Sequence, residues 1–311
     1  MESYAYFEGH FVPHAQAKVG IMTHALNYGT ACFEGIRAYW SQDHFSIFRI
    51  KDHYLRLSNS VRILKMSLPH DVDELCRLTV ELLAMNPYRE DVYIRPMAYK
   101  CSEVLGVRLH NVNDGFFIFI TPFGAYLDTE KGIACCTSSW KRIDDDMIPA
   151  RAKITGAYIN SALAKTEAVD NGFDEAILLT RDGHVSEGSG ENFFLVIDGH
   201  LVTPPVYDNI LVGITRQSII EIASRELGIE TEERTIDRTE LYIADECFLT
   251  GTAGEVAPVL SIDHRPVGSG AIGPVSAKLQ KLYMQIARGE RDAYNHWCTF
   301  LKPSLVEIAR K

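Results

Sequence analysis

Residues 151–158 place a lysine, Lys153, among small and apolar neighbours. A lysine removed from water has its pKa lowered by desolvation, and its neutral amine can act as a nucleophile or form a Schiff base. The alternative is an ordinary solvent-facing lysine at the start of a helix. Tyr158, five residues further on, adds a phenol that can donate or accept a hydrogen bond. The pair predicts amine chemistry if other residues support it.

A carboxylate and two glycine-containing turns supply further groups. Glu187 lies in the polar segment 185–192, which interrupts two apolar strands. Residues 213–216 open a predicted helix whose unpaired N–H groups and dipole favour an anion, with an ordinary threonine cap as the alternative. Residues 248–255 pass from an apolar strand into small hydroxyl and glycine residues, as in a backbone anion nest. Two such sites indicate a ligand with more than one anionic group.

Together these groups match the requirements of pyridoxal phosphate. This cofactor needs a lysine for its aldehyde, a carboxylate for its ring nitrogen, a donor for its phenolic oxygen and a helix N-terminus for its phosphate. Lys153, Glu187 and Tyr158 would fill the first three roles, and residues 213–216 the fourth. The second anion nest would then hold a substrate carboxylate.

Length and composition predict a folded protein of about two domains. A chain of 311 residues is long for a single core, so a cleft between two domains is expected. The hydrophobic content of 46% and charged content of 23% argue against a disordered or fibrous chain. A net charge of −10 without a basic block argues against nucleic acid and anionic membranes as partners. With no signal-peptide pattern and no apolar run long enough to span a bilayer, a cytoplasmic protein is expected.

The cysteines and histidines predict neither a disulfide framework nor a metal site. The seven cysteines are an odd number without a Cys-x-x-Cys pair, so most are expected to be buried, reduced thiols. His10 and His14 lie four residues apart, yet no cluster of His, Asp or Glu accompanies them.

The hydrophobic pattern predicts a small N-terminal domain at residues 1–122, an interdomain loop at 123–132 and a larger C-terminal domain at 133–311. The first domain alternates strands and helices. Its predicted strands are residues 4–12, 45–50, 93–96 and 115–121. Helical spacing occurs at Leu57, Val61 and Leu64 and again at Leu75, Leu78 and Leu82. Residues 23–37 are aromatic and short on charge, as either a pocket-lining loop or a buried structural loop would be.

The second domain is predicted to have an antiparallel core. Asp182-Gly183 and Asp198-Gly199 each separate two apolar runs, and this dipeptide is a strong hairpin signal. A helix after Lys153 ends at Asn171-Gly172. Its apolar stripe is predicted at Ile159, Ala162, Leu163 and Val169.

Residues 268–273 match the pattern G-x-G-x-x-G and are followed by helical spacing. In a dinucleotide-binding site this pattern begins a βαβ unit with a parallel sheet. Too little chain follows to complete such a unit, so the segment is interpreted as a turn.

Several short segments resemble one enzyme family. They are residues 27–30 with 33–37, 93–96, 124–127, 152–153, 186–188 with 190–192, 213–216 and 251–253. Jointly, over nearly the whole chain, they resemble the fold type IV pyridoxal-phosphate aminotransferases, and specifically the bacterial-type branched-chain amino acid aminotransferases. The resemblance implies a D-amino acid aminotransferase-like fold of mixed α+β and α/β character, with a small α/β domain and a larger domain with a β-barrel-like core. It also implies transamination of L-leucine, L-isoleucine and L-valine with 2-oxoglutarate, in a homodimer or a dimer-based hexamer.

The resemblance also implies roles for individual residues. Lys153 would bind the cofactor's aldehyde and shuttle the proton at the substrate's Cα, while Glu187 and Tyr158 would contact the ring nitrogen and the phenolic oxygen. The cofactor phosphate would be bound by Arg56, Ile214, Thr215 and Thr252. The substrate α-carboxylate would be bound by Tyr93, Thr252 and Ala253. The side-chain pocket would be lined by Tyr28, Phe33, Gly35, Val107 and Tyr126, some of them from a second subunit. Arg95 would meet the distal carboxylate of glutamate.

Two departures from the family pattern concern substrate choice. Phe123 precedes the segment 124–127, and the loop 100–112 contains no motif of the family. The alternative function is that of a sibling of the same fold, which would act on D-amino acids or (R)-amines or be an aminodeoxychorismate lyase. Such a sibling would share Lys153 and Glu187 and differ in the N-terminal motifs. A non-catalytic binding protein would be expected to lack one of these two residues.

Overall fold

The computed structural model describes residues 2–302, which form two compact units. The first unit contains the residues up to Gly124, Ala152–Gly156 and the residues from Gln285, and the second contains Ala125–Arg151 and Ala157–Met284. These units differ from the predicted consecutive ranges 1–122, 123–132 and 133–311, because two later segments return to the first unit. The physical reason is hydrogen bonding to first-unit strands. Residues 152–156 bond to residue 33, and the final strand bonds to residues 45–48.

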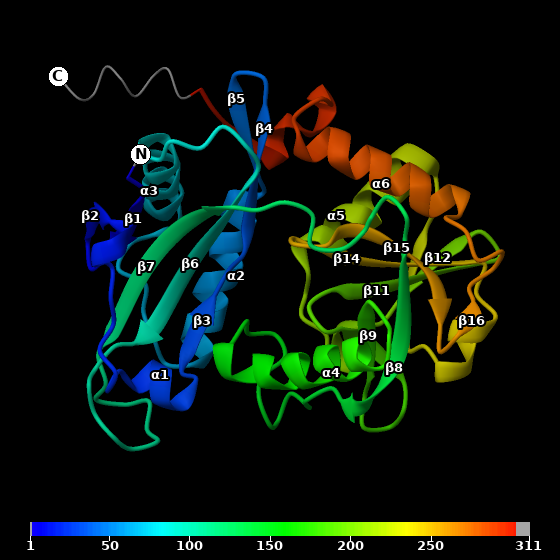
Figure 1. Cartoon of the computed structure of the whole chain (residues 1–311), viewed down its shortest axis with the longest axis horizontal. Helices are drawn as coiled ribbons and strands as arrows, with labels where there is room; N and C mark the ends of the chain where they lie inside the picture. Colours follow the sequence, from blue (N-terminus) through cyan, green and yellow to red (C-terminus); the bar gives the residue numbers. More distant parts are fainter. Residues whose placement is uncertain (1, 303–311) are drawn as a thin grey trace. The chain divides into compact units, whose positions relative to one another are not determined.

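The first unit is built on an 8-stranded sheet in the order β17-β5-β4-β6-β7-β1-β2, with β3 paired to β6 (Figure 1). The strands are β1 (Tyr4–Phe7), β2 (His10–Pro13), β3 (Ala31–Phe33), β4 (Ile36–Ser41), β5 (His44–Phe48), β6 (Val92–Lys100), β7 (Asp114–Pro122) and β17 (Cys298–Leu301). The helices are α1 (His24–Tyr28), α2 (Ile50–Ile63) and α3 (Val72–Met85). Strands and helices thus alternate as predicted, although the pairs within this sheet are antiparallel.

Helices α2 and α3 follow the predicted hydrophobic spacing. Leu57 and Val61 are buried in α2, and Leu75, Leu78 and Leu82 are buried in α3. Leu64, the third residue of the first predicted stripe, is instead the half-buried C-cap residue just beyond α2. Asp71 caps α3 by accepting a hydrogen bond from the backbone N of Glu74 at 2.8 Å. Such a cap satisfies one N–H of the first turn, which has no acceptor within the helix.

The second unit contains a closed barrel, as predicted from the family resemblance. The ring runs through β10 (Val185–Gly188), β9 (Glu175–Leu179), β8 (Ile133–Lys141), β15 (Glu255–Ile262), β14 (Glu246–Gly251) and β11 (Asn192–Ile197), which pairs again with β10. Strands β12 (His200–Thr203), β13 (Thr231–Glu233) and β16 (Arg265–Pro266) extend the sheet. The interior is apolar, with Phe193, Leu249 and Val259 among its buried residues.

The prediction of a purely antiparallel core was wrong for part of the barrel. Strand β8 runs parallel to both β9 and β15. The first parallel pair is joined by α4 (Tyr158–Asp170), because parallel neighbours need a long crossover connection. The two Asp-Gly hairpins, β9–β10 and β11–β12, are antiparallel as predicted.

The predicted apolar stripe of α4 was also wrong. Ile159, Leu163 and Val169 are exposed, whereas the buried face consists of Asn160, Ser161, Ala164 and Ala168. Ala164 and Ala168 pack with Cys136, Ala176 and Leu178 of β8 and β9. Small side chains let the helix approach these strands closely, so the larger apolar residues face outwards.

Helices α5 (Ile214–Ile222) and α6 (Pro274–Ala287) lie on the opposite side of the barrel from α4 (Figure 1). A π-helical turn, Ala223–Leu227, extends α5 to Gly228, which has a left-handed φ of 64°. Residues 268–273 connect the antiparallel pair β15–β16 to α6, so they form a turn and not a dinucleotide-binding loop, as predicted.

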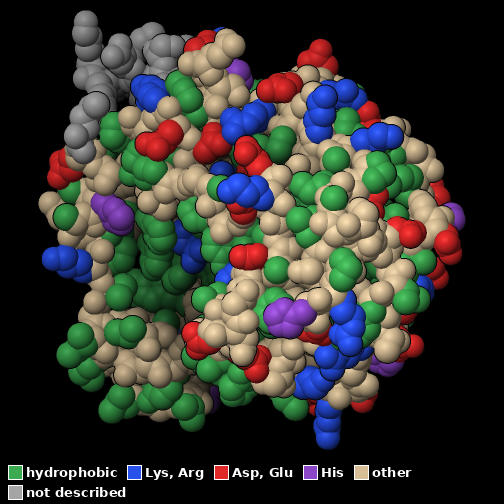
Figure 2. All heavy atoms as spheres, turned by 45° about the vertical axis from the view of Figure 1, so that its right-hand side comes forward, with side chains coloured by type: hydrophobic (Ala, Val, Ile, Leu, Met, Phe, Trp, Pro, Cys, Tyr) green, Lys and Arg blue, Asp and Glu red, His purple; other side chains and the backbone are tan. Residues whose placement is uncertain are grey.

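Acidic and basic side chains are interspersed on the face of the molecule in Figure 2. Within residues 2–302, no helix is long and apolar enough to cross a membrane. In the same part of the chain, no group of three or more His, Cys, Asp or Glu residues is arranged to hold a metal ion. All seven cysteines are free thiols, and Cys32, Cys135, Cys136 and Cys247 are buried.

Candidate active site

Lys153 is half-buried and held by the first unit. Its backbone carbonyl accepts a hydrogen bond from the N–H of Phe33 at 3.0 Å, and its own N–H donates to Oγ of Ser60 at 3.2 Å. The Nζ atom lies 5.1 Å from the centroid of the Phe33 ring. A short 3₁₀ turn, Thr155–Ala157, then leads into α4 at Tyr158, so the predicted helix after Lys153 is confirmed.

Two glycines allow the Lys153 segment to lie directly on the end of α1. The N–H of Gly156 donates to the carbonyl of Gly29 at 3.1 Å, and a Cβ on Gly29 would lie 2.8 Å from Cα of Gly156. Gly29 also has a φ of +66°, which favours glycine. The hydroxyl of Thr155 donates to the same Gly29 carbonyl at 2.9 Å. The backbone on the C-terminal side of Lys153 is therefore fixed.

Arg56, on α2, forms a two-pronged ion pair with the fully buried Glu34. Its Nε donates to Oε1 and its Nη2 to Oε2, both at 2.7 Å. Nδ1 of His53 lies 2.7 Å from the same Oε2. Burial alone would raise the pKa of Glu34, but the charge and hydrogen bonds of Arg56, with the bond from His53, hold it well below its ordinary value. Glu34 is therefore an ionised carboxylate in the core.

Arg95 and Tyr93, on β6, pack with Phe33 and Gly35. The Arg95 guanidinium lies 4.4 Å from the Phe33 ring centroid and donates to the Tyr93 hydroxyl at 3.2 Å. A Cβ on Gly35 would lie 1.8 Å from that hydroxyl oxygen, so only glycine leaves room for the phenol. Arg95 and three other predicted substrate-binding residues thus form one connected cluster.

Tyr28 and Val107 lie in a separate part of the first unit. The Tyr28 hydroxyl accepts a hydrogen bond from the N–H of Gly106 at 2.9 Å, which ties α1 to the loop 101–113. Val107, on the same loop, is 86% exposed.

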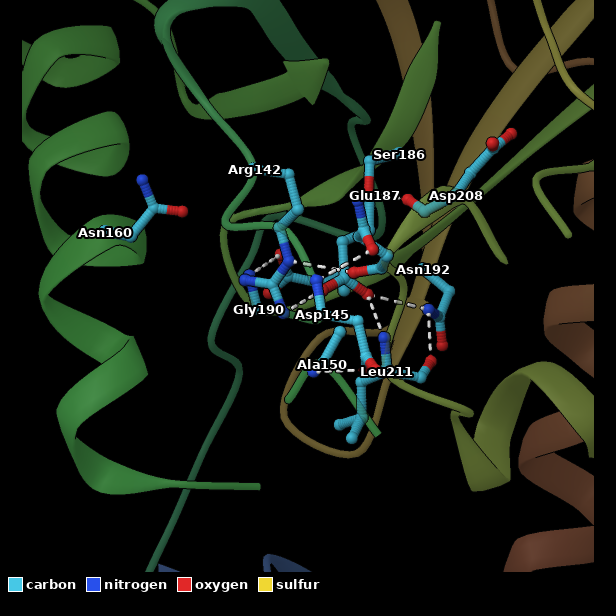
Figure 3. A network of polar contacts seen from close by, with 12 residues as sticks. Arg142, Asp145, Ala150, Asn160, Ser186, Glu187, Gly190, Asn192, Asp208 and Leu211 are labelled. Carbon is cyan, nitrogen blue, oxygen red and sulfur yellow. Dashed lines mark hydrogen bonds and ion pairs between the residues drawn. The ribbon is translucent and has the colours of Figure 1, made fainter. Parts of the chain in front are cut away.

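Glu187 of the second unit is the centre of a polar network at the end of β10 (Figure 3). Arg142 pairs with Oε1 at 2.8 Å, while Asn192 Nδ2 and the N–H of Leu211 both donate to Oε2 at 3.0 Å. Glu187 is 6% exposed. Three donors hold this carboxylate in one orientation.

The predicted anion site at residues 213–216 is the N-terminus of α5. Its N-cap is Gly213, which has no side chain to accept from the first-turn N–H groups, and Thr215 is 3% exposed. A Cβ on Gly213 would lie 1.9 Å from Oδ1 of Asn192, so the helix start approaches the Glu187 network closely. The neighbouring Thr250 hydroxyl is buried and has no hydrogen-bond partner in the described structure.

The N-terminus of α6 offers an internal comparison. Glu246 accepts hydrogen bonds from the N–H groups of Val275 and Ser276 at 3.0 and 2.8 Å. A protein carboxylate thus occupies the anion position of α6. This is a further reason why the G-x-G-x-x-G segment before α6 is not a phosphate site.

The second predicted anion nest is the turn between β14 and β15, which contains Thr252 and Ala253. Glu191, 4% exposed, lies beneath this turn. A Cβ on Gly251 or on Gly254 would lie 3.3 or 3.4 Å from its Cγ. A side chain at either glycine would therefore press against Glu191.

Tyr126 and Tyr158 belong to the second unit, and Tyr126 lies near a buried acidic group. The Tyr126 ring centroid lies 5.6 Å from Nζ of Lys165, which pairs with the buried Glu175 at 2.7 Å. Burial, and then the charge of Glu175, raise the pKa of Glu191 to about 8. Glu191 is therefore protonated near neutral pH.

Replacing Glu191 by glutamine is expected to stabilise the protein in alkaline solution. The folded protein keeps this proton where the unfolded chain, with an ordinary pKa near 4.5, has lost it. Native Glu191 therefore costs stability progressively as pH rises from about 4.5 to about 8. Each pKa unit corresponds to about 1.4 kcal/mol, so Glu191→Gln should gain stability relative to wild type over this range. Melting curves at several pH values measure the difference, and a difference that does not grow with pH would contradict the assignment.

Sequence reasoning did not find Arg142, Glu34 or His53. Arg142 lies 45 positions before Glu187 and carries no motif, so only the fold reveals their contact. Glu34 was part of a segment quoted for the family resemblance. A glutamate in an apolar, glycine-containing stretch indicates a buried carboxylate, and a buried charge needs a hydrogen-bonding or oppositely charged partner.

Comparison with known proteins supplies the family. The model of the amino-transferase class IV family matches residues 31–262. The chain belongs to this family. That range contains every predicted site residue from Phe33 to Ala253 and the whole barrel of this class IV aminotransferase, but not Tyr28.

Similar proteins extend over nearly the whole chain. A probable branched-chain-amino-acid aminotransferase of Aquifex aeolicus is 49% identical over 298 residues, which are 95% of this chain and 96% of that protein. The branched-chain aminotransferase of Thermoproteus uzoniensis, crystallised with norvaline, has a TM-score of 0.92 and 41% identity, covering 96% of this chain and 99% of that one. The branched-chain amino acid aminotransferase of Thermobaculum terrenum, crystallised in its PLP-form, has a TM-score of 0.92 and 38% identity, covering 96% and 98%.

Proposed function

We propose that this class IV aminotransferase uses pyridoxal 5'-phosphate to transfer the amino group of L-leucine, L-isoleucine or L-valine to 2-oxoglutarate, giving branched-chain 2-oxo acids and L-glutamate. Full-length similarity to branched-chain aminotransferases supports the substrate class. The observation that carries the proposal is the Glu187 carboxylate, which is buried and held by three donors. Such a group suits the protonated ring nitrogen of the cofactor.

The donor set of the second unit fits this cofactor. The glycine-capped start of α5 offers first-turn N–H groups to a phosphate, and the buried, unpartnered Thr250 hydroxyl lies on a strand beside it. Asn192 links this helix start to Glu187, because its side chain contacts both. Ile214, Thr215 and Thr252 are the proposed phosphate ligands, together with Arg56.

Each protein group has a distinct task in the proposed reaction. When bound, pyridoxal phosphate supplies an aldehyde that accepts the amino group and a ring that withdraws electrons from the substrate's Cα. Lys153 holds the cofactor through Nζ and moves the proton at Cα. Glu187 maintains the proton on the ring nitrogen, and Tyr158 hydrogen-bonds the phenolic oxygen. The N–H groups around Thr252 and Ala253, with Tyr93, orient the substrate carboxylate.

Arg95 is the residue proposed to let one pocket accept both leucine and glutamate. Its guanidinium lies against the Phe33 and Tyr93 rings, at 4.4 and 5.1 Å from their centroids. An apolar surface strongly disfavours an unpaired charge. A cation at its edge can pair with the distal carboxylate of glutamate, while leucine needs only the apolar surface.

Arg95→Met should therefore weaken the reactions of glutamate and 2-oxoglutarate by about 2–5 kcal/mol, the cost of removing one partner of a desolvated charge pair. The reaction of L-leucine should change much less. Single-turnover half-reactions with each amino acid measure the two effects, and a melting curve is the control for bracing of the sheet. Equal losses for leucine and glutamate would remove Arg95 from substrate discrimination.

A homodimer, or a hexamer built from such dimers, is the proposed assembly. The segments 19–26 and 103–107 carry exposed apolar side chains, including Ile21 at 87% and Leu105 at 69%. They are joined by the contact of His24 Nε2 with the Gly106 carbonyl at 2.9 Å. A second copy covering this surface would bury Val107, which the family resemblance assigns to the pocket. Sedimentation of the purified protein tests the assembly. The cytoplasmic location expected from the sequence stays a prediction.

A visible spectrum of the purified holoenzyme tests the reaction class. L-leucine, D-alanine and (R)-1-phenylethylamine are added in separate cuvettes. The proposal expects conversion to the amine form of the cofactor with L-leucine alone. Conversion only with D-alanine or with the amine would favour one of the sibling activities.

A further inference from the structure

We propose that Glu34 is a positioning residue for the cofactor phosphate and acts by fixing the orientation of Arg56. The inference rests on the proposed function, because it needs a phosphate at Arg56. It assigns to Glu34 a role separate from those of the residues that would contact cofactor or substrate. Three features of the first unit support it: the geometry of the ion pair, its rigid surroundings and its charge balance.

The geometry of the pair fixes the plane of the guanidinium. Nε and Nη2 of Arg56 each donate to a different oxygen of Glu34 at 2.7 Å. A single hydrogen bond would allow rotation about its own axis, but two parallel bonds do not. One edge of the guanidinium is thereby committed to Glu34, and the direction of the remaining N–H groups is set.

Glu34 is itself held rigidly. Its N–H donates to the carbonyl of Pro96 at 2.9 Å, and the N–H of the preceding Phe33 donates to the carbonyl of Lys153 at 3.0 Å. On the other side, Gly35 packs against the Tyr93 hydroxyl. The backbone that carries the carboxylate therefore contacts the segments that present the predicted lysine and substrate residues.

His53 adds a third donor, three residues before Arg56 on α2. Burial lowers the pKa of His53, and the 2.7 Å contact between its Nδ1 and the ionised Glu34 requires that Nδ1 carry the proton. His53 thus occupies a lone pair of Oε2 without adding charge. The carboxylate is immobilised by two side chains from consecutive turns of one helix.

Because Glu34 and Arg56 carry opposite charges, the direction in which phosphate affinity changes on removal of Glu34 is informative. Glu34 neutralises Arg56, so on charge alone its removal should strengthen attraction for a phosphate dianion. Its removal also frees the guanidinium to rotate, which should weaken phosphate binding. The proposal states that orientation outweighs charge. Glu34→Gln should then bind pyridoxal phosphate about tenfold to hundredfold more weakly, the loss of one hydrogen bond to a charged group.

The experiment compares pyridoxal phosphate with pyridoxal, which lacks the phosphate. Dissociation constants are measured by absorbance for wild type, Glu34→Gln and Asp52→Asn. Asp52 is the matched control, because it pairs with Arg49 at 2.6 Å on the same helix but is more exposed. The proposal expects weaker binding of pyridoxal phosphate by Glu34→Gln only, with pyridoxal unchanged. Tighter binding of pyridoxal phosphate, or equal losses for both compounds, would overturn it.

Arg56→Lys provides a second test if Glu34→Gln does not fold. Lysine keeps the charge but cannot form the two-pronged pair, so the same phosphate-dependent loss is expected. Wild-type affinity in Arg56→Lys would reject the positioning role. Failure of the wild-type protein to bind pyridoxal phosphate at all would instead contradict the proposed function.

Discussion

Replacing Lys153 by alanine is expected to abolish transamination, with the largest effect of any single substitution in the chain. Alanine removes both the amine that would hold the cofactor and the group that would carry the proton at Cα. Backbone contacts of residue 153 with Phe33 and Ser60 do not involve the side chain, so the fold should survive. Single-turnover rates with L-leucine measure the loss, and a melting curve verifies folding.

Chemical labelling identifies the amine directly. Borohydride reduction of the wild-type holoenzyme should remove its visible absorbance and leave the cofactor attached to the peptide that contains Lys153. Lys165 is an informative control, because it lies among titratable residues of the second unit and is paired with Glu175. A label on Lys165 or Lys141 would refute the assignment.

Glu187→Gln should slow the half-reaction by about 10²-fold or more, the scale for losing one buried electrostatic contact. A neutral amide cannot stabilise a positive ring nitrogen as a carboxylate does, and a charge-assisted hydrogen bond is about twice as strong as a neutral one. The substitution also leaves Arg142 without its anionic partner. Cofactor binding should weaken less than the rate, because the phosphate ligands are unchanged.

Glu246→Gln is the control for loss of a buried carboxylate elsewhere in the second unit. Glu246 caps α6, so this variant should lose thermal stability without a comparable loss of rate. Rates with L-leucine and dissociation constants for pyridoxal phosphate separate the two variants. A wild-type rate in Glu187→Gln would mean that another group pairs with the ring nitrogen.

Local sequence signals predicted those elements whose structure depends on residues close together in the chain. Helical spacing identified α2 and α3, and Asp-Gly identified both hairpins. Asp198 and Gly199 both adopt left-handed φ values, and in the other turn Gly183 has a φ of +95°. The start of α5 followed from Gly213 and Thr215. The barrel itself came from the family resemblance, since closure depends on pairing between β10 and β11 and on the parallel pairs of β8.

Other features could not be predicted because they depend on distant partners. The outward-facing Ile159 and Leu163 follow from close packing of small residues against β8 and β9, which no helical period reveals. Arg142 joins Glu187 only through the barrel. Val107 is exposed in one chain, so its predicted place in a pocket depends on a second copy.

The return of the final residues to the first unit has a consequence for synthesis on the ribosome. Strand β5 is complete early, but its neighbour β17 is made about 250 residues later. At roughly 5–20 residues per second, the chain between Gly124 and β17 takes roughly 10–35 s to emerge. During that interval β5 is an unpaired edge that carries Phe45, Ile47 and Phe48, a surface prone to aggregation. Because the first unit is assembled from three separate stretches of the chain, no single cut can release it in one piece.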